Sequence, residues 1–167
     1  MKTTKKGFTL IELIVVIAII GVLAAILVPS MLGYVKKSKV SSANSTASTL
    51  QKAINTTLIE VDEQTQASGD ITKVAKADTK TSTAIVFTGA PSTVDCEKKL
   101  KNYMEKAKKI AFEANCEGGA CTACAVMLDN TYTGTAPSGV VTVDNYKDYS
   151  KAAGMTKALA AAQALAS

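Results

Sequence analysis

The sequence predicts an α+β fold, in which a long N-terminal spine helix packs its C-terminal half on the small antiparallel β-sheet of a globular head. Three observations predict it. An apolar run fills residues 8–28, a one-faced apolar stripe continues to about residue 61, and short apolar runs bounded by turn residues follow residue 70. A continuous apolar run of this length is typical of a fully apolar helix, and a stripe with spacings of 3 and 4 is typical of a half-buried helix. Short apolar runs bounded by turn residues are typical of strands.

The first apolar run has the length of a membrane span. Residues 8–28 would extend about 31 Å as a helix, against about 30 Å for the hydrocarbon core of a bilayer. Lys2, Lys5 and Lys6 precede the run and suit the cytoplasmic side. A cleavable secretory signal has a shorter, uncharged apolar region, whereas this run contains Glu12. A plain membrane anchor explains the length but gives Glu12 no role.

The N-terminal segment carries a third, more specific pattern. Residues 5–12 read KKGFTLIE, and the pattern continues through Gly21 and Pro29 to about Tyr34. This segment resembles the class III signal of type IV prepilins and pseudopilins. The resemblance implies a type IV pilin-like fold. It also implies that a prepilin peptidase cuts between Gly7 and Phe8 and methylates the new Phe8 amine.

The resemblance implies partners and a location as well. The chain would lie in the cytoplasmic membrane as a single-pass protein with its head outside, surrounded by lipid, and would then form a helical homo-oligomeric filament at the cell surface. The implied machinery is the peptidase, an assembly ATPase and a membrane platform protein. The implied function is a structural pilus subunit serving adhesion, motility or surface attachment, with a pseudopilin of a type II secretion or DNA-uptake system as the alternative.

Glu12 is the fifth residue of the chain that remains after this cleavage. An ionised group at the centre of a membrane span costs roughly 2.5–3.5 kcal/mol, and less near the ends. An opposite charge at 4 Å returns about 4 kcal/mol at an effective dielectric constant of 20. We therefore expect Glu12 to pair with the Phe8 amine of a neighbouring copy. A carboxylate that reaches the membrane surface without a partner is the simpler alternative.

The spine helix is expected to have two halves. Residues 1–7 form the leader, 8–29 the apolar half, 30–66 the amphipathic continuation and 70–167 the head. Gly21 lowers local helix stability and Pro29 removes a backbone donor, so both are expected weak points in the helix. The stripe beyond Pro29 consists of Val40, Ala43, Ala47, Leu50, Ile54, Leu58 and Val61.

In the head we expect three or four strands and one helix. Residues 70–82 are expected to form a loop, 84–87, 124–128 and 140–143 to form strands, and 129–139 to form a turn-rich connection. Apolar positions spaced by 3 and 4 between residues 100 and 114 predict a helix that Gly118-Gly119 stops. Its lysine-rich face is expected to be solvated. The Ala-rich tail, residues 155–167, fits either a docked or a frayed helix.

Four cysteines lie in the head, and a location outside the cytoplasm favours disulfides. Cys96 and Cys116 bracket the predicted helix at a separation of about 30 Å, whereas a disulfide needs Cα atoms within about 7 Å. We therefore predict Cys96–Cys124 and Cys116–Cys121. The C-x-x-C formed by Cys121 and Cys124 also occurs in thiol oxidoreductases, but there it opens a helix.

The composition argues against a catalytic role. The chain has 167 residues, a formal charge of +5 and no histidine, which excludes His-based catalysis and His-ligated zinc. Because three of the lysines lie in the leader, the charge is weak evidence for nucleic-acid binding. No nucleophile–base pair, phosphate loop or metal cluster is visible, and no cofactor is expected. Asp144, Asn145 and Asp148 could bind calcium through oxygen ligands, but a turn with solvated acidic side chains is the preferred interpretation. A membrane-anchored thiol oxidoreductase is the remaining alternative.

Overall fold

The structure is a computed structural model that describes residues 7–77 and 84–167, in two compact units, Met1–Lys36 and Lys37–Ser167. The leader lysines and part of the predicted 70–82 loop lie outside the described residues. The boundary between the units falls within helix α1 (Leu10–Thr65), which contributes to both. The long helix predicted for residues 8–66 is confirmed.

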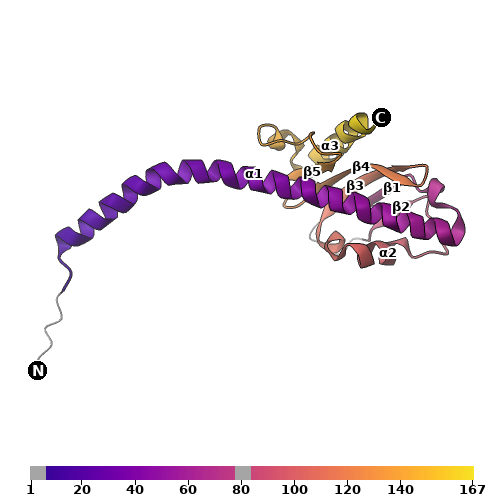
Figure 1. The fold of residues 1–167 in the computed structure, drawn as a ribbon, viewed down its shortest axis with the longest axis horizontal. Helices are drawn as coiled ribbons and strands as arrows, with labels where there is room; N and C mark the ends of the chain where they lie inside the picture. Colours follow the sequence, from indigo (N-terminus) through magenta and orange to yellow (C-terminus); the bar gives the residue numbers. More distant parts are fainter. Residues whose placement is uncertain (1–6, 78–83) are drawn as a thin grey trace, which may run out of the picture. The chain divides into compact units, whose positions relative to one another are not determined.

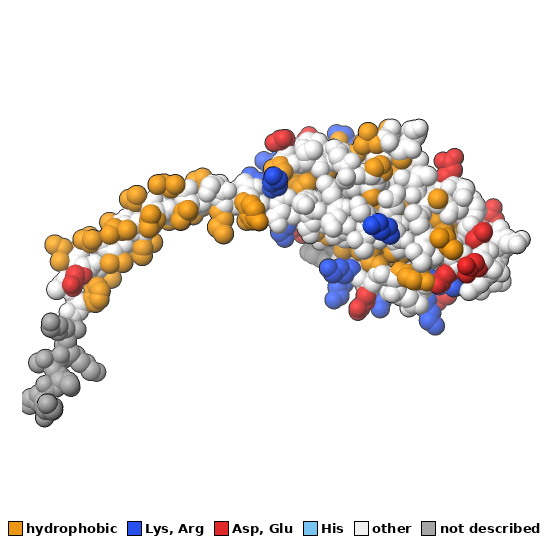
Figure 2. Space-filling model, viewed as in Figure 1, with side chains coloured by type: hydrophobic (Ala, Val, Ile, Leu, Met, Phe, Trp, Pro, Cys, Tyr) orange, Lys and Arg blue, Asp and Glu red, His pale blue; other side chains and the backbone are white. Residues whose placement is uncertain are grey.

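The described part of the first unit is almost entirely helix α1, and it buries nothing. Every residue from 7 to 36 is exposed to solvent, and hydrophobic side chains cover the visible surface of this unit (Figure 2). The helix continues through both Gly21 and Pro29. Ser30 follows the proline, and its hydroxyl donates to the carbonyl oxygen of Leu27 at 2.9 Å.

The second unit is a three-layer α+β head, which confirms the predicted fold class. Its sheet is antiparallel throughout, in the order β2-β1-β3-β4-β5. The strands are β1 (Lys73–Lys76), β2 (Val86–Thr88), β3 (Ala111–Glu117), β4 (Ala120–Met127) and β5 (Thr133–Ala136). The helices are α2 (Cys96–Tyr103) and α3 (Lys151–Ala166), with 3₁₀ turns η1 (Ser68–Asp70), η2 (Glu105–Lys109) and η3 (Tyr146–Tyr149).

Successive side chains of a strand point to opposite faces of the sheet, and a hydrophobic core lies on each face. On one face, α1 and α2 pack on side chains such as Phe112, Cys124 and Val126. On the other face, α3 packs on Ala125 and Met127 among others (Figure 1). The seven residues of the predicted α1 stripe are all buried.

Amide side chains of α1 bind backbone groups that the sheet leaves unpaired. A register shift between Asn115 and Cys116 interrupts the β3–β4 ladder. The Cys121 N–H donates to Asn55 Oδ1 at 2.6 Å, and its carbonyl accepts from Gln51 Nε2 at 3.1 Å. Asn44 accepts in the same way from the Thr135 N–H at 3.0 Å. These contacts satisfy buried backbone groups that would otherwise destabilise the fold.

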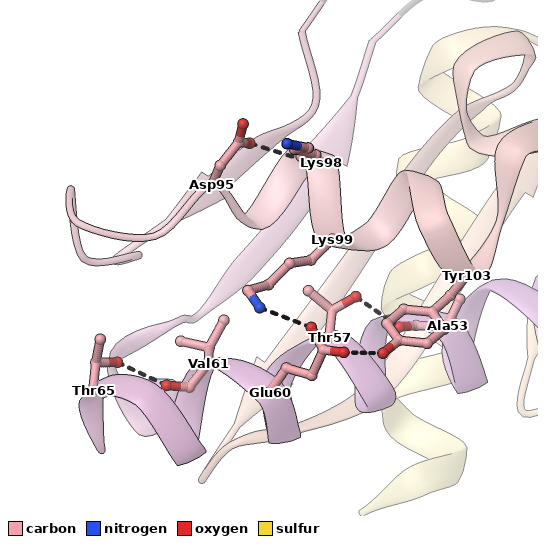
Figure 3. Close-up of polar contacts among 9 residues, drawn as sticks. All are labelled: Ala53, Thr57, Glu60, Val61, Thr65, Asp95, Lys98, Lys99 and Tyr103. Carbon is pink, nitrogen blue, oxygen red and sulfur yellow. Dashed lines mark hydrogen bonds and ion pairs between the residues drawn. The ribbon is translucent and has the colours of Figure 1, made fainter.

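Helix α2 is held against α1 by a polar contact that centres on Glu60 (Figure 3). Lys99 Nζ lies 2.8 Å from Glu60 Oε2, and the Tyr103 hydroxyl donates to the other carboxylate oxygen. Asp95 caps α2 by accepting from the Lys98 N–H at 2.9 Å.

Four element predictions in the head were wrong. The helix predicted to reach residue 114 ends at Tyr103, because 111–117 pair between β1 and β4 as a central strand. Residues 140–143 are not a strand, although Val140 and Val141 are buried. Instead, β5 lies within the predicted 129–139 connection, and β1 lies within the predicted 70–82 loop. The strands predicted near 84–87 and 124–128 correspond to β2 and β4.

Glycine allows β5 to lie directly against α1. A Cβ added to Gly134 would lie 2.0 Å from the carbonyl carbon of Ala43. Only a residue without a side chain fits there.

The alanine-rich tail forms a docked helix, which is one of the two predicted alternatives. Met155, Ala158 and Leu159 of α3 are buried in the second core.

Candidate assembly site

The first turn of α1 is organised by Thr9 and Glu12. The Thr9 N–H and Thr9 hydroxyl donate to Glu12 Oε2 at 2.8 and 2.7 Å, and Thr9 Oγ1 accepts from the Glu12 N–H at 3.3 Å. This reciprocal arrangement is a capping box, T-x-x-E, which satisfies two donors that a helix N-terminus leaves free. Sequence reasoning missed it, although the T-x-x-E spacing is visible in the sequence.

The capping box leaves half of the Glu12 carboxylate available. Both Thr9 donors bind Oε2, and within the described residues Oε1 has no hydrogen-bond partner. Phe8 lies next to this turn with 79% of its surface exposed. Intramolecular capping and an ion pair with a second chain are therefore compatible, because they use different oxygen atoms.

The helix that carries this turn meets the length and composition of a membrane span. Its most apolar 18-residue window has a mean hydropathy of 3.2, and none of that window is buried. Length and composition alone also fit a signal sequence, but no other helix in the described residues passes the same test. The predicted positions Gly21 and Pro29 lie within the exposed apolar part of this helix.

The four cysteines are buried in the core that α1 and α2 form with the sheet. Each is buried and present as a thiol. Cys116 and Cys121 are Cα partners across the β3–β4 hairpin. Cys124 Sγ lies 3.1 Å from the Ala47 carbonyl oxygen. A Cys96–Cys116 disulfide was excluded from the sequence because a long helix was expected between the two residues. That reason was wrong, because α2 ends at Tyr103 and Cys116 lies in β3.

The environment of the thiols opposes thiolate chemistry. Hydrogen bonding to Cys121, together with burial, raises the pKa of Cys116. At Cys121 the bond with Cys116 favours the thiolate, but hydrogen bonding to Cys124 and burial outweigh it, so the pKa of Cys121 is also raised. A redox-active C-x-x-C needs a lowered pKa at a helix N-terminus. Here both residues of the motif lie within β4.

Comparison with known proteins gives matches at both the motif and the whole-chain level. Residues 2–28 match the model of the prokaryotic N-terminal methylation motif. One type IV major fimbrial protein FimA of Dichelobacter nodosus is 32% identical over 131 residues, which cover 78% of this chain and 80% of the relative. The chain belongs to the type IV fimbrial protein family. Predicted family membership is thereby confirmed.

Other relatives match over a shorter stretch. A second FimA protein of Dichelobacter nodosus is 48% identical over 60 residues, and a fimbrial protein of Pseudomonas aeruginosa is 46% identical over 56 residues. These matches span 38% and 36% of the relatives' lengths and 36% and 34% of this chain. No solved structure matches. The relatives are structural fimbrial proteins, which supports a structural role for this fimbrial chain.

Residues 86–153 also match a model of the 2Fe-2S iron-sulfur cluster binding domain. The spacing of Cys116, Cys121 and Cys124 is C-x₄-C-x₂-C, as in plant-type ferredoxins, which place a fourth cysteine downstream. No cysteine follows Cys124 in this chain. Within residues 7–77 and 84–167, no group of three or more His, Cys, Asp or Glu side chains is placed to hold a metal ion. The residues do not fit an iron–sulfur cluster.

Proposed function

We propose that this chain is the structural subunit of a type IV pilus that polymerises helically through the apolar half of α1, residues 8–29. The single observation that carries this proposal is the apolar first unit, whose described side chains are all exposed. Burying one large aliphatic side chain is worth about 1.5–3 kcal/mol, and this segment exposes more than a dozen of them. Membrane lipid before assembly, and copies of the same helix afterwards, are surfaces that remove such a segment from water.

Processing at residues 1–7 produces the group that Glu12 needs. Cleavage between Gly7 and Phe8 leaves an amine at Phe8, and the free Glu12 oxygen is a suitable acceptor for it. We propose that Glu12 of an entering subunit pairs with the Phe8 amine of its neighbour and thereby fixes the axial stagger between them. A Glu12→Leu variant should be processed and inserted in the membrane yet give no fibres. Normal fibres from this variant would contradict the proposal.

Gly21 and Pro29 are proposed to let the helix adapt during assembly. Glycine lowers helix stability by about 1 kcal/mol relative to alanine, and proline removes the hydrogen bond to the residue four positions earlier. The helix is continuous at both positions in the described protomer. A local loss of helical hydrogen bonds on packing would therefore begin at these two residues.

The head is proposed to be stabilised by disulfides in its oxidising location. The Cα atoms of strand partners lie about 4.5–5.5 Å apart, within the range that a disulfide requires, which supports Cys116–Cys121. Cys96 and Cys124 share the core under α1, which supports their pairing. Peptide mapping of purified fibres without reductant tests both bonds. Four alkylatable thiols after denaturation would contradict them.

The proposed location is the cytoplasmic membrane before assembly, with the head outside, and a surface pilus afterwards. A prepilin peptidase, an assembly ATPase and a membrane platform protein are the proposed partners, and adhesion, motility or surface attachment is the proposed role. The decisive experiment is the mature N-terminus of the chain recovered from sheared fibres. N-methylphenylalanine at Phe8 is expected. An N-terminus beyond Pro29 on a secreted monomer would refute the proposal.

A further inference from the structure

One surface of the head carries lysines that the fold does not use. In η2, Lys106, Lys108 and Lys109 are exposed and alternate with the buried residues Ala107 and Ile110. Within the described residues none of these three lysines makes an ion pair or a hydrogen bond. We call them the η2 lysines.

Other lysines of the same region are already paired. Lys99 is bound by Glu60 (Figure 3). Lys101 is bound by Glu97 within α2. The exception is Lys98 of α2, which is exposed and whose ammonium group has no partner among the described residues, so the unpaired lysines of this region are Lys98 and the three η2 lysines. The η2 segment is fixed by buried side chains on one face and presents three unpaired ammonium groups, beside the single exposed carboxylate of Glu105, to solvent.

An acidic surface lies around the end of α1. It consists of four exposed residues, which we call the acidic end: Asp62, Glu63, Asp70 and Glu117. The β3–β4 turn lies against the turn that follows α1, since a Cβ on Gly119 would lie 2.8 Å from Ser68 Oγ. Figure 2 shows acidic side chains gathered over one end of the head.

The two surfaces lie near opposite ends of the same strand. The η2 lysines immediately precede β3, which begins at Ala111, and Glu117 is the last residue of β3. Seven residues of a strand extend about 23 Å at roughly 3.3 Å each. This separation exceeds the screening length of about 8 Å at physiological ionic strength. The surfaces therefore do not neutralise each other within one head.

The acidic end also breaks a local rule of helix stability. Asp62 and Glu63 lie in the last turns of α1, and the last turn contains no basic residue. The macrodipole of a helix favours cations at this end and disfavours carboxylates. Ser68 Oγ donates to Asp62 at 2.6 Å, but no described residue supplies a cation to Glu63. A cation from another molecule would satisfy this position.

We propose that the η2 lysines of one head bind the acidic end of a second copy, in a head-to-tail contact repeated along the filament. This inference rests on the proposed function, because a helical polymer repeats one contact between two different surfaces of the same chain. Exposed ion pairs are individually weak, so the apolar helices supply the affinity. The head contact sets the salt dependence and the spacing of the heads.

A nucleic acid or acidic polysaccharide is a different partner for the same lysines. Single-stranded nucleic-acid surfaces combine positive charge with aromatic side chains on which bases stack. The exposed aromatic residue beside η2 is Tyr103, whose hydroxyl is engaged by Glu60. The chain's own acidic end is the partner that the structure supports better.

Charge exchange on the full-length chain tests the contact. Lys108→Glu/Lys109→Glu and Glu63→Lys/Glu117→Lys should each lower the yield of sheared fibres at low salt by at least about fivefold, because like charges then face each other. The combined quadruple variant, which keeps the wild-type net charge, should restore the yield. Lys147→Glu/Lys151→Glu, at η3 and the start of α3, is the matched control, because both side chains are exposed and unpaired within the described residues, and it should leave the yield unchanged.

Several results would overturn the inference. The first is that the quadruple variant does not recover the fibre yield although its extracted monomer is as stable as wild type. The second is an equal loss of fibre yield in the control variant. The third is a wild-type fibre yield from both double variants. Loss of heparin or duplex DNA binding to otherwise normal fibres would assign the lysines to a polyanion instead. Wild-type fibres provide a test on the unmodified protein. They should lose stiffness as salt is raised from about 50 to about 500 mM, because salt screens the attraction between exposed charges. Unchanged stiffness would also overturn the inference.

The outcome is separable from that of the proposed function. If Glu12→Leu abolishes fibres while both charge variants assemble as wild type, only the head contact is refuted. If Glu12→Leu assembles normally, only the pairing of Glu12 with the Phe8 amine is refuted. If the wild-type chain is recovered as a secreted monomer with an N-terminus beyond Pro29, the proposed function itself is refuted.

Discussion

Substitution of Glu12 by glutamine separates the two roles that the structure gives this side chain. Glutamine at this position of a capping box still accepts from the Thr9 N–H and hydroxyl, so the first turn of α1 keeps its cap. The substitution removes only the negative charge. The measured hydrogen bonds to Oε2, at 2.7 and 2.8 Å, can be made by an amide oxygen in the same place.

The two roles differ in size. A lost cap costs about 1 kcal/mol, whereas an ion pair at 4 Å is worth about 4 kcal/mol at an effective dielectric constant of 20. At 1.4 kcal/mol per factor of ten, the charge contributes at most roughly two to three orders of magnitude to the affinity between subunits, and the cost of removing the carboxylate from water offsets part of this gain. Glu12→Gln should therefore be nearly free of fibres, and Thr9→Ala, which removes the cap and keeps the charge, should retain most of them.

The assay compares two fractions, membranes and sheared fibres, from each strain. Immunoblots measure the chain in membranes and in sheared fibres, and mass spectrometry of the membrane fraction measures the methylated N-terminus at Phe8. Processing and insertion should be equal in wild type, Glu12→Gln and Thr9→Ala. Normal fibres from Glu12→Gln together with none from Thr9→Ala would show that Glu12 acts only as a cap, and would refute the pairing.

Three further predictions concern the head and are measured by unfolding of the detergent-solubilised chain. Gly134→Ala should lower the stability by about 1–3 kcal/mol, because its Cβ would overlap the backbone of Ala43; an unchanged melting temperature would contradict the close approach. Thr135→Val should be neutral or stabilising by about 1 kcal/mol, since the buried Thr135 hydroxyl has no partner among the described residues, and a clear loss of stability would reveal one. Bonds from Lys99 and Tyr103 hold the pKa of Glu60 below its ordinary value, so their stabilisation is present above the ordinary glutamate range and is lost as the pH falls through the lowered pKa. Glu60→Gln should flatten this acid dependence, and an unaltered pH profile would show that the contact is not formed.

The spine helix could be predicted because its signals are local. The stripe from Val40 to Val61 repeats at helical spacing, and every member is buried as predicted. Pro29 did not end the helix, which is continuous from Leu10 to Thr65. Phe8, Glu12 and Cys116 could be singled out as candidate site residues for the same reason: their signals are a short motif and a residue type.

The sheet was harder to predict because long-range pairing decides it. Apolar residues at 107, 110, 111 and 114 fit helical spacing, yet β1 and β4 on either side take residues 111–117 as a strand. The β5 sequence TGTA contains no large apolar residue, because α1 lies too close to Gly134 to admit one. Hydropathy does not detect a strand whose residues are selected for small size.

The carboxamides of Asn44, Gln51 and Asn55 give α1 a mechanical role. Each bonds a backbone group of the sheet at a fixed position along the helix. Apolar side chains can slide past one another at little cost, but directional bonds must break before the helix shifts by a turn. Tension on the helix therefore passes into the strands as a load shared among three anchor points, and the head should resist being pulled off its own stem.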